Sequence, residues 1–200
     1  GQGFCRTVME IAENYPSQVL PILMNFLSTH DTPRILSLLS PSAPPTDKDE
    51  CAFYRMSDTD REQAIRRYRC AAFLQFILPG MPCLYYGDEI GSEGLGDPFC
   101  RRWFDWDAVK NNAIHDFIKE LARLRNRNKV LAHGDVNVAV DGPGCITVTR
   151  AYNGTICRAT VNVGAEMTKM QKGKIIFKHG ADSNGNTIRM PSYSFVCEMY

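Results

Sequence analysis

The chain has 200 residues, 44% of them hydrophobic and 22% charged, with a formal net charge of +1. These values describe an ordinary globular chain that forms one domain or two small ones. A nearly neutral charge gives no reason to expect a nucleic acid or an anionic membrane as partner, and no apolar run approaches the roughly 20 residues of a membrane-spanning helix.

A predicted helix and a predicted strand precede a pair of titratable residues near the start of the chain. Apolar residues recur at helical spacing over residues 4–14 and predict a helix, which Pro16 ends. A nearly continuous apolar run at 22–27 then predicts a strand that is covered on both faces. His30 and Asp31 follow it directly. Side chains just past the carboxyl ends of parallel strands do the chemistry of α/β barrels and open α/β sheets.

A second predicted strand is likewise followed by titratable residues. A short apolar helix is predicted near residues 35–39, and the proline- and acid-rich stretch 40–50 is a loop, either a lid or a plain solvated insertion. A long helix is predicted at 58–78, with acidic residues in its first turn where the helix dipole favours them. The strand expected at 82–86 would complete a right-handed βαβ unit if it lies beside the first strand.

A glycine-rich loop at 87–97 follows the second strand, and a helix is predicted at 111–127. From residue 131 the apolar period changes to two, and Asn153-Gly154 is a typical hairpin turn. Residues 180–186 are expected to form a loop. The tail is therefore predicted to be an antiparallel β-domain.

Three stretches stand out in this order: MNFLSTHDTPR from residue 24, LPGMPCLYYGDEIG from residue 78, and GDPFCRRWFDWD from residue 96. Together they resemble the α-amylase superfamily of glycoside hydrolases, in its neopullulanase and cyclomaltodextrinase branch. The resemblance implies an α/β fold. Residues 1–130 would be the C-terminal portion of a (β/α)8 TIM barrel, its last two strands and helices, and residues 131–200 a small antiparallel β-sandwich domain.

The same resemblance implies retaining hydrolysis of α-1,4 glucans such as starch, maltooligosaccharides and cyclodextrins, with three carboxylates at the site. Asp31 matches the third of these, the catalytic carboxylate that holds sugar hydroxyls and stabilises the transition state. His30 matches the histidine that donates a hydrogen bond to the same sugar. The alternative is that His30 and Asp31 only cap a loop.

Further substrate-binding residues are implied at Arg34, Asp97 and Arg101. Arg34 either orients Asp31 and shapes the pocket or forms a purely structural ion pair. Asp97 and Arg101 match a loop that lies near the substrate in the family, where an arginine suits a bidentate clamp; whether they contact ligand is open. The carboxylates of the GDE segment that ends the second strand are expected to be structural.

The aromatic residues Trp103, Phe104 and Trp106 have two interpretations. They either stack on sugar rings or pack beneath the rim of the barrel. The sequence departs here from the branch, which more often has Pro-Met before its Trp-Asp, and the packing interpretation is favoured.

Two catalytic motifs of the family are absent from the sequence: the G-F-R-x-D segment of the nucleophile and the later glutamate of the acid/base. We therefore predict that this chain alone is inactive and shares its site with the remainder of a parent barrel. No metal or cofactor is predicted in this chain, and the resemblance allows for calcium in the missing part of the parent. A non-catalytic carbohydrate-binding or interaction module on a degenerate barrel, and a transglycosylase, are the alternatives; a homodimer is left open.

Eight cysteines are scattered along the chain without C-x-x-C pairs, which excludes the usual zinc and redox spacings. Cys70 and Cys83 lie in apolar runs and are expected to be buried. This usage favours a reducing, cytoplasmic compartment. The sequence begins Gly-Gln-Gly, without Met or a leader, so we expect a cut at this point.

Overall fold

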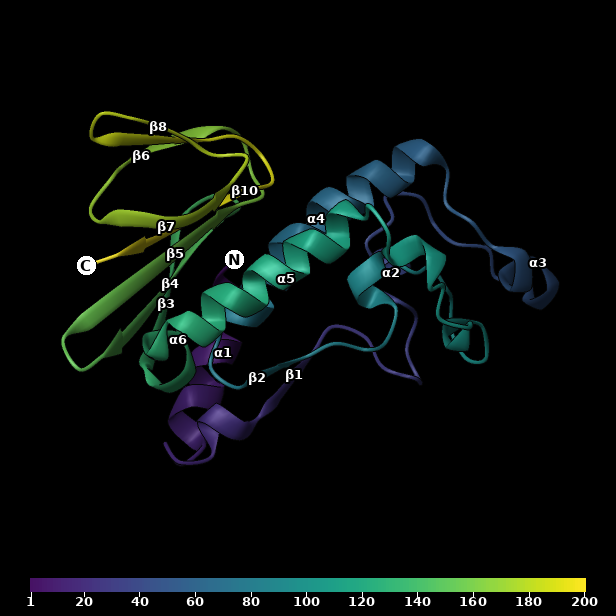
Figure 1. Ribbon diagram of the computed structural model, residues 1–200, viewed down its shortest axis with the longest axis horizontal. Coiled ribbons are helices and arrows are strands. Elements are labelled where there is room, and N and C mark those ends of the chain that lie inside the picture. The colour runs from purple at the N-terminus through teal and green to yellow at the C-terminus, as the bar shows by residue number, and fades with distance from the viewer. The chain divides into compact units, whose positions relative to one another are not determined.

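The computed structural model describes all 200 residues (Figure 1). By packing, the chain forms two compact units. The first unit comprises residues 1–24, 76–81 and 123–200, and the second unit comprises residues 25–75 and 82–122. The predicted division at residue 130 into a barrel portion and a β-domain stays a prediction.

Six α-helices and four 3₁₀ turns form. The helices are α1 (Gln2–Asn14), α2 (Ile35–Leu38), α3 (Lys48–Phe53), α4 (Asp58–Ile77), α5 (Ala113–Arg127) and α6 (Lys129–His133). The 3₁₀ turns are Leu20–Ile22, Asp88–Ile90, Phe99–Arg101 and Asp107–Val109. The helices predicted at 4–14, 58–78 and 111–127 are thereby confirmed. No helix is both long and apolar enough to span a membrane.

Two predictions about helices were wrong. The loop expected over 40–50 ends earlier, because the Asp47 side chain accepts the backbone N–H groups of Asp49 and Glu50 and so caps α3. Residues from 131 onward were expected to be extended, but α6 forms first. Val130 and Leu131 are buried, and α6 packs against β4 and β5. The helix forms because of this burial, and its sequence is too short to show an apolar period.

The strands β1 (Met24–Phe26) and β2 (Met81–Cys83) pair with each other in a two-stranded sheet. Both are shorter than predicted. Gln75 of α4 donates to the carbonyl oxygens of Asn25 at 2.7 Å and of Cys83 at 3.0 Å, which fixes the carboxyl ends of the two strands beside one helix.

The prediction that the first strand is covered on both faces was wrong. Met24 is 55% exposed and Phe26 is 49% exposed, because only β2 pairs with β1 and no layer covers these two side chains. Cys83 is likewise only half-buried, whereas Cys70 is buried as expected.

The end of α4 is fixed by arginines in the first unit. Arg125 donates to the carbonyl oxygens of Phe76 at 2.6 Å and Leu78 at 3.1 Å. Arg150 of β4 donates to that of Ile77 at 2.6 Å. The last carbonyl groups of a helix have no partner within the helix, so these guanidinium groups satisfy them. Burial lowers the pKa of each arginine to about 10.

The tail is antiparallel β structure, as predicted. Its strands are β3 (Asp135–Gly142), β4 (Cys145–Tyr152), β5 (Thr155–Asn162), β6 (Met167–Met170), β7 (Lys174–His179), β8 (Asp182–Asn184), β9 (Thr187–Met190) and β10 (Ser194–Met199). Five of them form a sheet in the order β3-β4-β5-β10-β7, and three form a sheet in the order β6-β9-β8 (Figure 1). Asn153 and Gly154 both have positive φ, which confirms the hairpin turn.

The prediction of a loop at 180–186 was partly wrong, because β8 forms there and pairs with β9. This pairing uses backbone groups, so the sequence shows no apolar alternation. Both sheets contribute to one apolar core. Its buried members are Ala181, Ile188, Met190 and Val196, with Met167 and Ile175 packed against them. The whole chain is thus an α/β protein with antiparallel sheets.

Candidate functional site

Four of the sequence-predicted site residues form one exposed charged cluster in the second unit: His30, Asp31, Asp97 and Arg101. His30 Nε2 lies 3.1 Å from one carboxylate oxygen of Asp31, and an Arg101 nitrogen lies 3.2 Å from the other. Arg101 Nε lies 2.5 Å from Asp97 Oδ1. The four side chains are between 46% and 69% exposed, so a ligand can reach them from solvent.

The loop after β1 shapes the position of Asp31. The Thr32 hydroxyl accepts the backbone N–H of Thr29 at 2.8 Å, and the Thr29 hydroxyl accepts that of Asp31 at 3.3 Å. Such hydroxyl-to-backbone bonds hold tight polar turns. The Asp31 carboxylate therefore projects from a braced turn with a cation on one side and an imidazole on the other.

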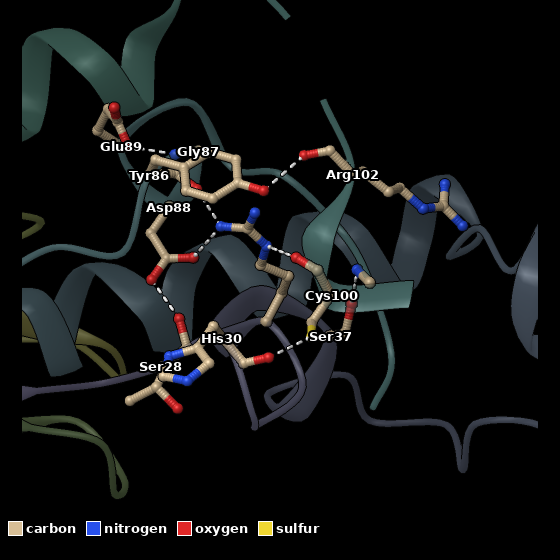
Figure 2. Close-up of polar contacts among 12 residues, drawn as sticks. Ser28, His30, Ser37, Tyr86, Gly87, Asp88, Glu89, Cys100 and Arg102 are labelled. Atoms are coloured by element: carbon tan, nitrogen blue, oxygen red, sulfur yellow. Dashed lines mark hydrogen bonds and ion pairs between the residues drawn. The ribbon is translucent and has the colours of Figure 1, made fainter. Parts of the chain in front are cut away.

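Arg34, the remaining predicted site residue, is only 1% exposed. Its Nε donates to the Cys100 carbonyl oxygen at 2.7 Å, and another guanidinium nitrogen donates to the Tyr86 carbonyl and lies 3.4 Å from Asp88 Oδ1 (Figure 2). The guanidinium carbon also lies 4.2 Å from the centre of the Tyr85 ring. These contacts include an ion pair with Asp88, as the second alternative for Arg34 describes.

Asp88 is the buried carboxylate of the pair, 3% exposed. It accepts a hydrogen bond from the Ser28 hydroxyl, which faces it in Figure 2. Burial raises the pKa of Asp88 to about 6, although Ser28 and Arg34 act in the opposite direction. Glu89 accepts the backbone N–H of Gly87 at 2.7 Å. These contacts agree with the expected structural role of both carboxylates.

Three further bonds connect the segment after β1 to the loop after β2. The Arg34 backbone N–H donates to Gly94 at 2.9 Å, and Gly94 donates to the Ser37 hydroxyl at 3.0 Å. The Cys100 thiol donates to the His30 carbonyl at 3.1 Å (Figure 2). Sequence reasoning missed Ser37 and Cys100 at the site, since a single small polar residue in an apolar segment gives no signal of its partner.

The aromatic residues of the third motif do not pack as favoured. Trp103 is 98% exposed and Trp106 is 77% exposed. The prediction that they pack beneath the rim of the barrel was therefore wrong for both. The Phe104 and Trp106 rings form an edge-to-face pair, with centroids 4.6 Å apart and ring planes at 63°. No group of three or more His, Cys, Asp or Glu side chains is arranged to hold a metal ion.

Comparison with known proteins gives sequence relatives and fold neighbours. The chain is 37% identical over 129 residues to an amylopullulanase of Thermoanaerobacter thermohydrosulfuricus, a match that covers 64% of this chain and 8% of the relative. It is 32% identical over 134 residues to a cyclomaltodextrinase of Geobacillus thermopakistaniensis, covering 66% and 19%. No family model matches the chain.

A solved structure of the debranching enzyme from Nostoc punctiforme superimposes with a TM-score of 0.76 at 21% identity, over 98% of this chain and 39% of that one. At this identity the likeness shows the fold alone. The chain spans less than a fifth of the length of the two sequence relatives. By its sequence matches and its three motifs, this chain is similar to part of the amylopullulanases and cyclomaltodextrinases, the branch of the α-amylase superfamily that the motifs resemble.

Proposed function

We propose that this chain supplies part of the substrate site of a retaining glycoside hydrolase that acts on α-1,4 glucans such as starch, maltooligosaccharides and cyclodextrins. Asp31 is the carboxylate that stabilises the transition state, and His30, Asp97 and Arg101 bind sugar hydroxyls. The observation that carries the proposal is the exposed charged cluster, in which Asp31 lies 3.1 Å from His30 and 3.2 Å from Arg101.

The chemistry follows from the charge that develops during glycoside cleavage. The transition state resembles an oxocarbenium ion, and a fixed carboxylate lowers its energy most where little reorganisation is needed. Arg101 and His30 hold the two oxygens of Asp31 in place before the sugar arrives. His30 can then exchange its contact with Asp31 for a hydroxyl of the same sugar.

Arg34 has a positioning role in this proposal rather than a direct one. Its donors are directed to the Cys100 and Tyr86 carbonyls and to Asp88, and its 1% exposure leaves no path for a sugar. Since the Cys100 thiol also holds the His30 carbonyl, Arg34 supports the cluster through the backbone on which Arg101 and His30 lie.

The nucleophile and the acid/base lie outside these 200 residues in the proposed enzyme, because neither motif occurs in the sequence. In this account residues 1–130 complete a (β/α)8 barrel with the remainder of a parent chain, and residues 131–200 form a β-sandwich. The chain itself needs no cofactor, and calcium would bind elsewhere in the parent. Analysis of products formed from maltotriose distinguishes hydrolysis from transglycosylation, because both pass through the same covalent intermediate.

The test is Asp31→Asn in the parent protein that contains this chain. We expect kcat on maltotriose to fall about 10²- to 10³-fold, the usual cost of removing one group that stabilises transition-state charge. Asp107→Asn is the matched control, because the Asp107 side chain is 95% exposed and pairs only with Lys110 at the surface. It should leave kcat unchanged.

Equal kcat values for Asp31→Asn and for the unaltered protein would contradict the role of Asp31. Sugar binding without any turnover by the unaltered parent would favour a non-catalytic carbohydrate-binding module instead.

A further inference from the structure

Two buried cysteines meet on neighbouring strands of the five-stranded sheet. In the antiparallel pair β5–β10, Cys157 lies opposite Met199 and Cys197 lies opposite Ala159, so the cysteines are diagonal neighbours. Their Sγ atoms are 3.0 Å apart, and neither side chain is exposed. Cys51 and Cys100, by contrast, direct their thiols to backbone carbonyl oxygens.

We propose that Cys157 and Cys197 are a redox-active thiol pair that a small-molecule disulfide converts to an intramolecular disulfide. A bonded pair of sulfurs is about 2.05 Å apart, so the two atoms need to approach by about 1 Å. The diagonal position on adjacent strands already brings both sulfurs to the same face of the sheet.

The local environment makes the two thiols unequal. The hydrogen bond from Cys197, helped by Arg150, lowers the pKa of Cys157 against the effect of burial. The same hydrogen bond and burial raise the pKa of Cys197. These directions belong to the closed sheet, in which the two sulfurs are in contact. The thiolate is the attacking species in exchange, and either cysteine can supply it once β10 is detached.

The reaction balances as two exchange steps. The thiolate of one cysteine attacks one sulfur of oxidised glutathione, which forms a mixed disulfide and releases one glutathione thiolate. The other cysteine then gives up its proton, attacks the protein sulfur of the mixed disulfide and displaces the second glutathione. Two protein thiols are oxidised and one glutathione disulfide is reduced to two thiols. Since neither cysteine is exposed, the first step takes place while β10 is detached, during folding or local opening.

The test is to refold the chain from urea in a glutathione redox buffer and to map its disulfides by mass spectrometry of non-reduced peptides. We expect two of the eight thiols to disappear and one peptide pair to join Cys157 to Cys197. The melting temperature should rise by roughly 5–15 °C over the reduced protein, as expected for a cross-link that closes a loop of this size.

Cys145→Ser is the matched control, because Cys145 is a buried cysteine of the adjacent strand β4 and has no thiol contact. This variant should still form the cross-link, whereas Cys157→Ser and Cys157→Ala should not. Eight free thiols in the refolded unaltered chain, or a disulfide that joins any other two cysteines, would overturn the proposal. The peptide map of the unaltered chain decides this even if a variant does not fold.

Discussion

Asp31 and Asp88 each come shortly after one of the paired strands, yet they differ sharply in burial. Asp31 has a side chain 69% exposed and contacts two groups that a sugar can compete for. Asp88 is 3% exposed and contacts Ser28 and Arg34. A carboxylate in the first setting can act on a ligand, whereas one in the second can only hold the protein together.

The burial of Asp88 predicts a pH-dependent stability. Its pKa is about 6 in the folded protein, above the usual 3.8, because burial disfavours the charge. The folded state therefore binds this proton more tightly than the unfolded state does. The stabilisation is complete below about pH 4 and is lost as the pH rises through 6, by up to about 3 kcal/mol.

Urea unfolding of the unaltered chain and of Asp88→Asn at pH 4, 5, 6 and 7 isolates this effect, because other carboxylates contribute equally to both proteins. The unfolding free energy of the unaltered chain minus that of Asp88→Asn should fall across this range, as the unaltered chain loses stability. Parallel pH curves for the two proteins would show that Asp88 keeps its ordinary pKa in the fold.

At the scale of elements, the loop after β2 is held by a close approach of backbones at Gly94. A Cβ atom added there would lie 2.4 Å from the Phe99 carbonyl oxygen and 3.0 Å from the Cys100 Cα. Both are backbone atoms, which cannot rotate away. The same glycine bonds to Arg34 and to Ser37, so the loop cannot move without breaking those bonds.

Gly94→Ala should therefore lower the free energy of unfolding by about 1–3 kcal/mol, a typical cost of overpacking. Gly96→Ala is the control in the same loop, because a Cβ at Gly96 meets nothing within 4 Å. Denaturant titration of both variants makes the comparison. Equal midpoints for the two would mean that the backbone around Phe99 is free to shift.

The long elements were predictable from the sequence, and the short ones were not. The apolar period of α5 extends over several turns, and the alternation around Val136 and Val138 over several residues, so both signals are strong. The helix α4 was indicated by its length and by the acidic residues of its first turn. The elements α3, α6 and β8 are three to six residues long and depend on a cap, on burial and on strand pairing. A local pattern contains none of that information.

The candidate site was predictable in its exposed part only. The motifs located His30, Asp31, Asp97 and Arg101, which the fold does bring together. The burial of Arg34 depends on partners more than 50 positions away in sequence, which no motif describes. The roles of those exposed residues in binding and catalysis stay predictions.

At the scale of the whole molecule, the second unit contains the entire exposed charged cluster and its buried support. It also contains the exposed end of β1, where Phe26 is 49% exposed. In the proposed enzyme this unit supplies only one of the three carboxylates that the reaction needs, from a site that hydrogen bonds brace from within.

Turnover by the purified 200-residue chain tests this claim most directly. The chain is incubated with maltotriose, a cyclodextrin and pullulan, and released reducing sugar is measured, with circular dichroism as the control that the chain is folded. We expect no turnover above the uncatalysed rate, because the nucleophile and acid/base motifs are absent from the sequence. Turnover that is lost in Asp31→Asn would contradict the account, since a complete catalytic site would then lie within these residues.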